Sequence, residues 1–344
     1  MLMGKLVFVH IVEKGDLEFK SILLCSSIRK YGGIYKDSLI YAITPRKDKE
    51  VSCQTKEIYK KLNVKYIYKS LNIKWYDQPY LNSIYGAAFI EKYYLNSDVS
   101  FVYVDADTFF IKQPDKLDLE KNKVQIAVTP IDSIKAEIAN SDINNISEYW
   151  KHVYKLFNID INKLWCIKTL HDNKNIVAYF NIGIISVKPS LQIFQECLEK
   201  IEMAYTDPYF SGLPKGSLER FYLDQVFTSA AVVKYPRDKI LLLDSNYNYS
   251  LPVMKRIDQK KFKTLVHIHY HQMFFYRRTL KIFQGNVDIY NFLKLYVPFQ
   301  LDKKIRTILF IKSHIPIKIK NYLRETSLMK YINKVLNKVG INVG

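Results

Sequence analysis

The feature that most constrains this chain is a regular alternation of apolar runs with helical patterns between residues 6 and 129. Alternating β and α units of this size predict a mostly parallel, Rossmann-like sheet with helices on both faces. The expected strands are residues 6–12, 38–44, 64–68, 101–105 and 125–129, and the expected helices between them are residues 17–31, 55–62 and 79–95.

The second half of the sequence has a different pattern. Residues 179–187 and 264–270 are typical of strands, whereas residues 190–204 and 217–231 are typical of helices. The polar segment 132–164 predicts a loop with one helix over residues 149–157. Because α/β sheets bind ligands beyond the carboxyl ends of their strands, polar residues that directly follow a strand are the first candidates for a site.

Composition excludes several classes of protein. Hydrophobic residues make up 48% of the chain and charged residues 25%, which is ordinary globular usage rather than that of a disordered or fibrous chain. The four cysteines form no C-x-x-C pair, so we expect reduced thiols rather than a zinc ribbon or a disulfide scaffold. Residues 6–12 lack a small-residue cleavage site and run into Glu13, which favours a strand over a signal peptide. We therefore expect a cytoplasmic location.

The net charge of +19 indicates an anionic partner, namely nucleic acid, a phosphate-bearing substrate or an acidic membrane surface. Residues 301–344 hold ten basic and two acidic residues, so we divide the chain into a catalytic domain (1–300) and a basic helical tail (301–344). In the tail, Leu328, Ile332 and Val335 recur at helical spacing, with lysines on another face. Such a helix can lie on the inner face of an anionic membrane, or it can pack on the catalytic domain or a dimer partner.

Two carboxylates follow the apolar run that ends at Val104. If the backbone stayed extended through Asp105, Ala106 and Asp107, both carboxylates would project to one side of the chain. Paired carboxylates at this separation can hold Mg²⁺ or Mn²⁺ and leave positions open for substrate oxygens. A solvated turn is the alternative structural interpretation.

Four segments in order resemble a known family. The helix and strand before Asp105-Ala106-Asp107, together with the motif itself, resemble the donor site of GT-A-fold glycosyltransferases, especially the glycogenin and bacterial lipopolysaccharide galactosyltransferase-like family 8. Later segments resemble that family's "FNxG" strand, its "DQ" segment and its late "HY" strand, at residues 180–183, 224–225 and 269–270. The resemblance covers residues 5–275.

The resemblance implies a set of residue roles. Metal ligands would be Asp105, Asp107 and His269, with His271 as the second choice for the histidine. The residues implied to contact the nucleotide or the donor sugar are Ile11, Val12, Ala106, Asp132, Asn181, Gly183, Asp224 and Gln225. On the sequence alone, His267, His269 and His271 alternate, so a strand would place all three on one face.

The expected function is therefore a metal-dependent transfer of a hexose from a nucleotide-diphosphate sugar, with UDP-hexose as the first choice, to a glycan or lipid-linked acceptor. Family 8 would imply retention of the anomeric configuration, and the sequence leaves retention or inversion open. Two other classes stay open. A sugar-phosphate nucleotidyltransferase should carry a glycine-rich phosphate loop, where this chain has only Gly15 after the first strand. A basic nucleic-acid-binding protein would use the charge and the 14% aromatic content, but no nucleic-acid module is recognisable.

Overall fold

The structure is a computed structural model that describes residues 6–134, 138–140, 142–254, 257, 259–271 and 280–296. Its centre is a seven-stranded sheet in which only β9 runs antiparallel to its neighbours. The strands, in sheet order, are β10 (Ile240–Leu242), β6 (Ile126–Pro130), β9 (Phe180–Val187), β4 (Ser100–Val104), β1 (Leu6–Ile11), β2 (Leu39–Thr44) and β3 (Val64–Tyr68).

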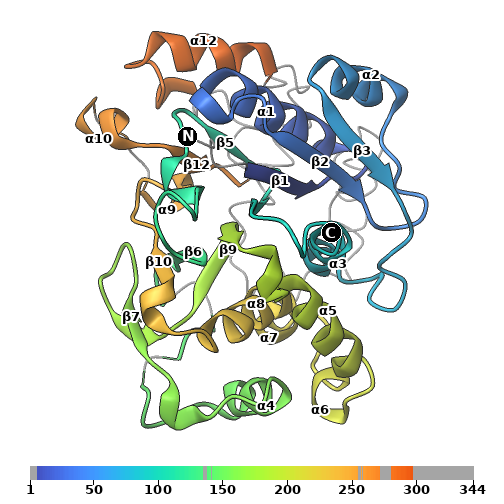
Figure 1. The fold of residues 1–344 in the computed structure, drawn as a ribbon, viewed down its shortest axis with the longest axis vertical. Helices are drawn as coiled ribbons and strands as arrows, with labels where there is room; N and C mark the ends of the chain where they lie inside the picture. The colour runs from blue at the N-terminus through green and yellow to red at the C-terminus, as the bar shows by residue number, and fades with distance from the viewer. Residues whose placement is uncertain are drawn as a thin grey trace, which may run out of the picture.

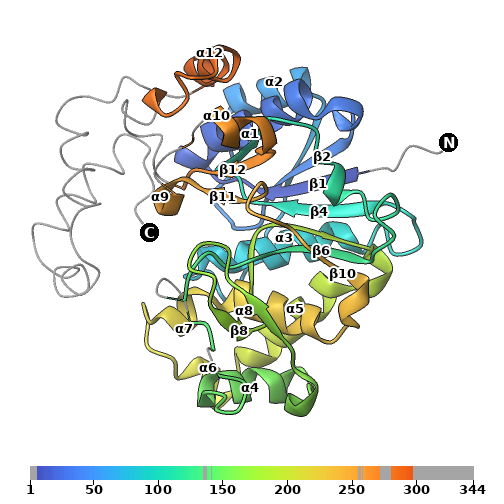
Figure 2. The ribbon, with the colours of Figure 1, turned by 90° about the vertical axis from the view of Figure 1, so that its left-hand side faces the viewer.

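Helices cover both faces of this sheet, as Figures 1 and 2 show. One face packs on α1 (Asp16–Tyr31) and α2 (Cys53–Lys61), and the other on α3 (Asn82–Glu91), α5 (Ile193–Ala204) and α8 (Leu223–Val233). The central strand β1 is therefore buried on both sides, which is why it is apolar at nearly every position and all six of its residues are buried, whereas only Val64 of the edge strand β3 is buried. The predicted fold class is confirmed.

Outside the sheet, α4 (Glu148–Leu156) and the short α6 (Pro208–Ser211) lie beneath α8 in Figure 2. The other described strands form two small sheets. One joins β11 (Tyr249–Ser250), β12 (His267–His269) and β5 (Thr108–Phe110), and the other joins β7 (Cys166–Lys168) and β8 (Asn175–Val177). The remaining described α-helices are α7 (Leu218–Phe221), α9 (Leu251–Met254), α10 (Gln259–Thr264) and α12 (Val287–Tyr296).

The predicted strands of the first half each agree with an observed strand to within about one residue at either end. Two elements predicted in the second half differ from the structure. The helix expected at 217–231 is divided at Tyr222 into α7 and α8. The strand expected at 264–270 is shorter in the structure, where it is β12 (His267–His269), because α10 extends to Thr264.

A third core, separate from the two faces of the main sheet, joins the end of the described chain to its beginning. It packs Phe109 of β5 and Tyr270 against Phe283 and Phe292. On its surface, Asp288 of α12 accepts hydrogen bonds from Lys30 and Tyr31 of α1, at 2.7 and 2.8 Å. The segment 280–296 is therefore part of the globular body.

Glu91 shows how α5 is fixed at its start. This carboxylate is fully buried and accepts hydrogen bonds from the backbone N–H groups of Phe194 and Gln195, at 3.4 and 2.9 Å. These are among the first N–H groups of α5, which have no partner within the helix. Glu91 thus acts as a tertiary cap.

We expect Glu91→Ala to lower the free energy of unfolding by about 2–3 kcal/mol, because buried N–H groups lose their acceptor. Urea denaturation measures the change. Glu57→Ala is the matched control, because that glutamate is exposed and its ion pair is with the exposed Lys60. Equal losses in both variants would contradict the capping role.

The predicted basic tail lies outside the described residues. Within the part of the chain that the structure describes, no helix has the length and apolar character needed to cross a membrane.

Candidate active site

The candidate site lies at the edge of the sheet where β1, β2 and β4 end. The segment Asp105–Asp107 forms a turn between β4 and β5, so the extended backbone considered from the sequence is not formed. The Thr108 hydroxyl closes this turn by donating to the Asp105 carbonyl at 2.6 Å. Asp105 and Asp107 therefore have different neighbours.

A local irregularity in β9 brings a second segment to this turn. The pairing of β6 with β9 shifts between Val128–Ile185 and Thr129–Asn181, so β9 carries extra residues here. Gly183 is one of them, and its carbonyl accepts a hydrogen bond from the Asp105 N–H at 3.0 Å. The bulge thus places the predicted Asn181 and Gly183 directly beside the predicted carboxylates.

Asp107, His269 and His271 form the centre of the site. One possible ligand atom from each lies within 4.8 Å of those of the other two. His269 Nε2 is 3.1 Å from Asp107 Oδ1, and the two imidazole rings stack with their centroids 3.7 Å apart. One carboxylate oxygen and two imidazole nitrogens form a donor set suited to a divalent transition metal, so these residues fit a metal site. Asp105 is not part of this group.

Hydrogen bonds fix the orientation of His269. The Gly183 N–H donates to Asn181 Oδ1 at 2.8 Å, which makes that oxygen an acceptor. Asn248 therefore presents its Nδ2 to the same oxygen, at 2.8 Å, and its Oδ1 to His269 Nδ1, at 3.0 Å. It follows that Nδ1 carries a proton and that Nε2 faces Asp107. In metal sites, a hydrogen-bond partner on the ring nitrogen that does not bind the metal sets the tautomer of the histidine.

The charges of the group are coupled. Burial alone would raise the pKa of Asp107, but the bonded His269 outweighs it and holds that pKa below the usual range. Burial lowers the pKa of His269, and Asp107 more than compensates, so the net shift is upward. For Asp105, burial and the neighbouring Asp107 raise the pKa to about 6, while its Oδ1 accepts a hydrogen bond from the Tyr103 hydroxyl at 2.9 Å.

The three histidines of the late segment have different roles. His267 is fully buried against the Phe110 ring, and its Nδ1 accepts a hydrogen bond from the Asn248 N–H at 3.2 Å. Burial holds the pKa of His267 well below its usual value, which makes it a neutral core residue. His271 follows β12 in a left-handed conformation, with φ 49°. Such strain in a non-glycine residue is characteristic of functional sites.

Asp224 and Gln225 open α8 on the other side of Asp105. Both are buried. Asp224 Oδ2 is 3.3 Å from the Ser83 hydroxyl of α3, and Gln225 Nε2 donates to the Tyr179 hydroxyl at 2.6 Å. Burial, with a contribution from the Asp105 charge, raises the pKa of Asp224 to about 8. Asp224 is therefore protonated at neutral pH and can donate a hydrogen bond.

The other residues predicted to contact the nucleotide or the donor sugar lie in different parts of the structure. Asp132 follows β6, and burial raises its pKa to about 6, against the opposing charge of His269 and a hydrogen bond with Ser250. It therefore lies at the same edge as the histidines. Ile11 and Val12 are buried in the cores on the two faces of the sheet. Ala106 is buried within the turn.

Sequence reasoning missed two residues of this site. Asn248 has no motif, and its left-handed φ of 51° is the only local feature that marks it. Lys20 of α1 is only 3% exposed, forms an ion pair with Asp16 at 3.2 Å, and its charge lowers the pKa of both Asp105 and Asp107. A lysine on the apolar face of a helix is the signal that could have indicated it.

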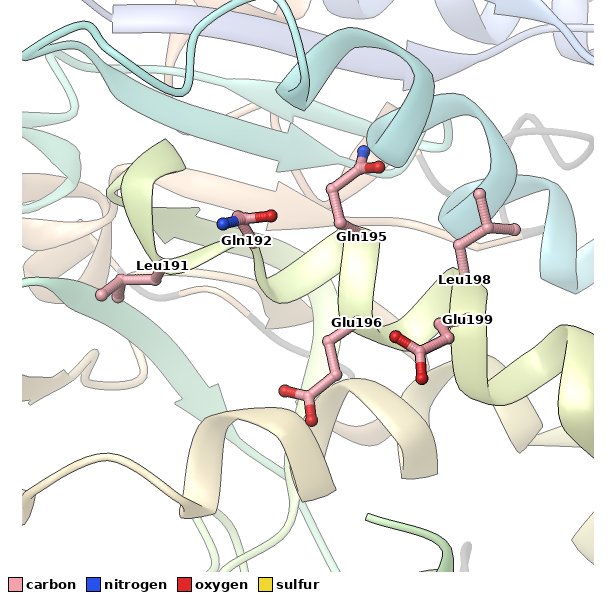
Figure 3. Close-up of a pocket in the computed structure, with 6 residues that line it drawn as sticks. All are labelled: Leu191, Gln192, Gln195, Glu196, Leu198 and Glu199. Carbon is pink, nitrogen blue, oxygen red and sulfur yellow. The ribbon is translucent and has the colours of Figure 1, made fainter.

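A hollow on the surface of α5 contains none of these residues. It is lined by Leu191, Gln192, Gln195, Glu196, Leu198 and Glu199 (Figure 3). Its two carboxylates are unsuited to a diphosphate, because like charges repel. The edge of the sheet is the stronger candidate.

Solved structures of glycosyltransferases resemble the fold at low sequence identity. The apo form of mouse xyloside xylosyltransferase 1 is 12% identical, with a TM-score of 0.40 over 78% of this chain and 98% of that chain. The apo bifunctional glycosyltransferase WbbM is 14% identical, with a TM-score of 0.41 over 78% of this chain and 46% of that one. No curated protein sequence matches the chain.

A family model gives the stronger comparison. The model described as the Rhodobacterales glycosyltransferase domain matches residues 8–234, which is more than half of the 344 residues. The matched part includes the turn at Asp105–Asp107 and Asp224, and it ends before Asn248 and the histidines. It supports glycosyl transfer over nucleotidyl transfer or nucleic-acid binding, whereas membership of family 8 stays a prediction. The chain belongs to the Rhodobacterales glycosyltransferase domain family.

Proposed function

We propose that the protein transfers a hexose from a nucleotide-diphosphate sugar, with UDP-hexose as the first choice, to a glycan or lipid-linked acceptor. The observation that carries this proposal is the group Asp107, His269 and His271, which lies at the ligand-binding edge of the sheet in a glycosyltransferase chain. A diphosphate leaving group needs charge neutralisation at such a place.

Asp107, His269 and His271 would hold the metal ion. Two imidazoles favour Mn²⁺ over Mg²⁺, since Mg²⁺ prefers an all-oxygen octahedral shell. The ion would neutralise the negative charge that develops on the departing diphosphate. Asn248 holds the His269 ring with Nε2 facing Asp107, and the buried Lys20 adds a positive charge nearby.

The sugar would lie between this group and α8. Protonated Asp224 can donate a hydrogen bond to a donor-sugar hydroxyl, and Gln225 and Asn181 line the same region by analogy with family 8. Gly183 leaves no side chain where the turn and β9 approach one another. In a retaining enzyme of this type, the acceptor hydroxyl would attack from the face of the leaving group.

A screen of donor hydrolysis tests the proposal. UDP-, GDP- and CMP-sugars are incubated with the full chain and Mn²⁺, and with EDTA as the control. We expect slow hydrolysis of a UDP-hexose that EDTA abolishes. Failure to hydrolyse or bind any nucleotide sugar would overturn the proposed donor class.

The two histidines should differ in their effect on metal binding. His269→Ala is expected to weaken Mn²⁺ affinity about 10- to 100-fold, and more than His271→Ala does. The reason is that His269 forms hydrogen bonds with Asp107 and Asn248, whereas the hydrogen-bond contact described for His271 Nε2 is the longer one to Ser250, at 3.4 Å. The signal of free Mn²⁺ in electron paramagnetic resonance measures the affinity, with His152→Ala on α4 as the control. If His271→Ala weakened Mn²⁺ affinity more than His269→Ala, the roles assigned to the two histidines would be exchanged.

We also propose that residues 301–344 attach the enzyme to an anionic membrane surface. Their net charge is +8, and each Lys or Arg near such a surface contributes about 1 kcal/mol. Deleting them is expected to release the protein from phosphatidylserine vesicles in a sedimentation assay, while donor hydrolysis survives. Continued sedimentation would contradict membrane attachment, and loss of hydrolysis would assign the segment to the catalytic domain instead.

A further inference from the structure

Two aromatic rings stand exposed beside the buried Asp224. Tyr80, just before α3, is 48% exposed, and Phe221, at the end of α7, is 37% exposed. Their ring centroids are only 4.2 Å apart, at an interplanar angle of 52°. We call this pair the aromatic platform. Large aromatic side chains are usually buried, so an exposed pair in mutual contact indicates a binding surface.

The aromatic platform is joined to the candidate site by short stretches of chain. Ser83 follows Tyr80 by three residues, and its hydroxyl lies 2.7 Å from the Tyr80 carbonyl and 3.3 Å from Asp224 Oδ2. Asp224 in turn follows Phe221 by three residues. Through Ser83 and these three-residue spacings, Asp224 links the platform to the candidate site.

The rings are held in place by the chain beneath them. Arg220 is 8% exposed, lies over the Trp75 ring at 5.1 Å, and donates hydrogen bonds to the Leu213 carbonyl and to Asp77, both at 3.4 Å. The Tyr149 hydroxyl donates to the Glu219 carbonyl at 3.0 Å. These contacts fix α7 against the segment before α3, so the platform is formed before any ligand binds.

A sugar ring fits this surface better than a charged or fully apolar ligand does. A hexopyranose has one face of C–H groups, which can cover an aromatic ring, and hydroxyls at its edge. Around the platform, Asp77 and Lys215 are exposed and supply polar groups for such hydroxyls. A diphosphate has no apolar face, and its proposed site is at Asp107.

We propose that Tyr80 and Phe221 form the acceptor subsite, on which the pyranose ring of the acceptor stacks with a hydroxyl directed toward the donor sugar beside Asp224. The assignment rests on the proposed function, and it adds the part of the site that recognises the acceptor.

The test uses the full chain with Mn²⁺ and UDP, and three methyl hexopyranosides as probes: those of glucose, galactose and mannose. Saturation-transfer NMR detects their binding whether or not they are glycosylated. Tyr80→Ala and Phe221→Ala are expected to weaken binding of the best probe at least about 10-fold. Tyr80→Phe, which keeps the aromatic ring, is expected to bind the probe as the wild type does.

Two further variants separate stacking from folding. Phe221→Leu keeps an apolar side chain without a flat face and should also lose the probe. Tyr93→Ala is the matched control, because Tyr93 is 65% exposed and lies beyond the other end of α3. For a probe that is glycosylated, the acceptor KM should rise with the loss of binding, while the donor KM changes by less than about 2-fold.

Four results would overturn the assignment, and the first three concern the probes and the donor. One is that the wild type binds none of the probes, another is that the alanine variants bind them as well as the wild type does, and the third is that the variants raise the donor KM instead. Binding of a long-chain alkyl glycoside but of no methyl glycoside would assign the platform to lipid and also overturn it. Ring-dependent binding by a protein that hydrolyses no nucleotide sugar would support a sugar surface while refuting the proposed donor.

Discussion

Asp107→Asn is expected to reduce transfer and donor hydrolysis at least about 10²-fold, the largest effect of any single substitution in this site. The change removes one negative charge and keeps the shape of the side chain. It takes away the carboxylate that His269 bonds at 3.1 Å and that lies within 4.8 Å of both proposed imidazole ligands. Mn²⁺ affinity should fall with activity, whereas the far-UV circular dichroism spectrum should not change.

Asp238→Asn is the matched control, because Asp238 is exposed and forms an ion pair with the adjacent Lys239, at 3.5 Å. Turnover by the control should equal that of the wild type. If Asp107→Asn turned over normally, the metal site would have to be placed elsewhere.

Gly183→Ala is expected to cost both stability and activity. A Cβ at this position would lie 2.5 Å from Asn248 Oδ1, 2.8 Å from His269 Nδ1 and 3.0 Å from Asn181 Oδ1. These atoms form the hydrogen-bond network that orients His269, so they must move apart. We expect the free energy of unfolding to fall by about 1–3 kcal/mol and turnover to fall about 10²-fold.

Gly285→Ala tests whether the effect is specific to position 183. A Cβ at residue 285 meets nothing within 4 Å, so stability and turnover should stay close to those of the wild type. Urea denaturation and donor hydrolysis measure the two quantities. Retained turnover in Gly183→Ala would mean that His269 does not need its contact with Asn248.

The first half of the fold could be predicted because its signals are local. Strands such as β1 and β2 are mostly apolar, and helices that are adjacent in sequence bury most of their residues. The strands β5, β10 and β11 are two or three residues long and depend on partners far along the chain, so no local pattern indicates them. The break at Tyr222 likewise depends on tertiary contacts, because α7 packs toward the segment before α3.

The candidate site was predictable only in part, for a related reason. Asp107 and His269 could be paired through the resemblance of short motifs, and the structure places them in contact. Asn248 could not be found, because its role depends on a left-handed backbone and on the bulge that brings Asn181 to it. The separation of Asp105 from the group reflects the turn, which the pattern D-x-D alone does not specify.

The antiparallel pairing of β5 with β12 has a consequence for how the enzyme is made. It brings together Asp107 and His269, which are 162 positions apart, and packs them over the core closed by Phe283 and Phe292. At ribosomal speeds, the second partner emerges about 10–30 s after the first. The parallel strands and their helices can fold during that interval, so a nascent chain acquires its scaffold well before it can carry out chemistry.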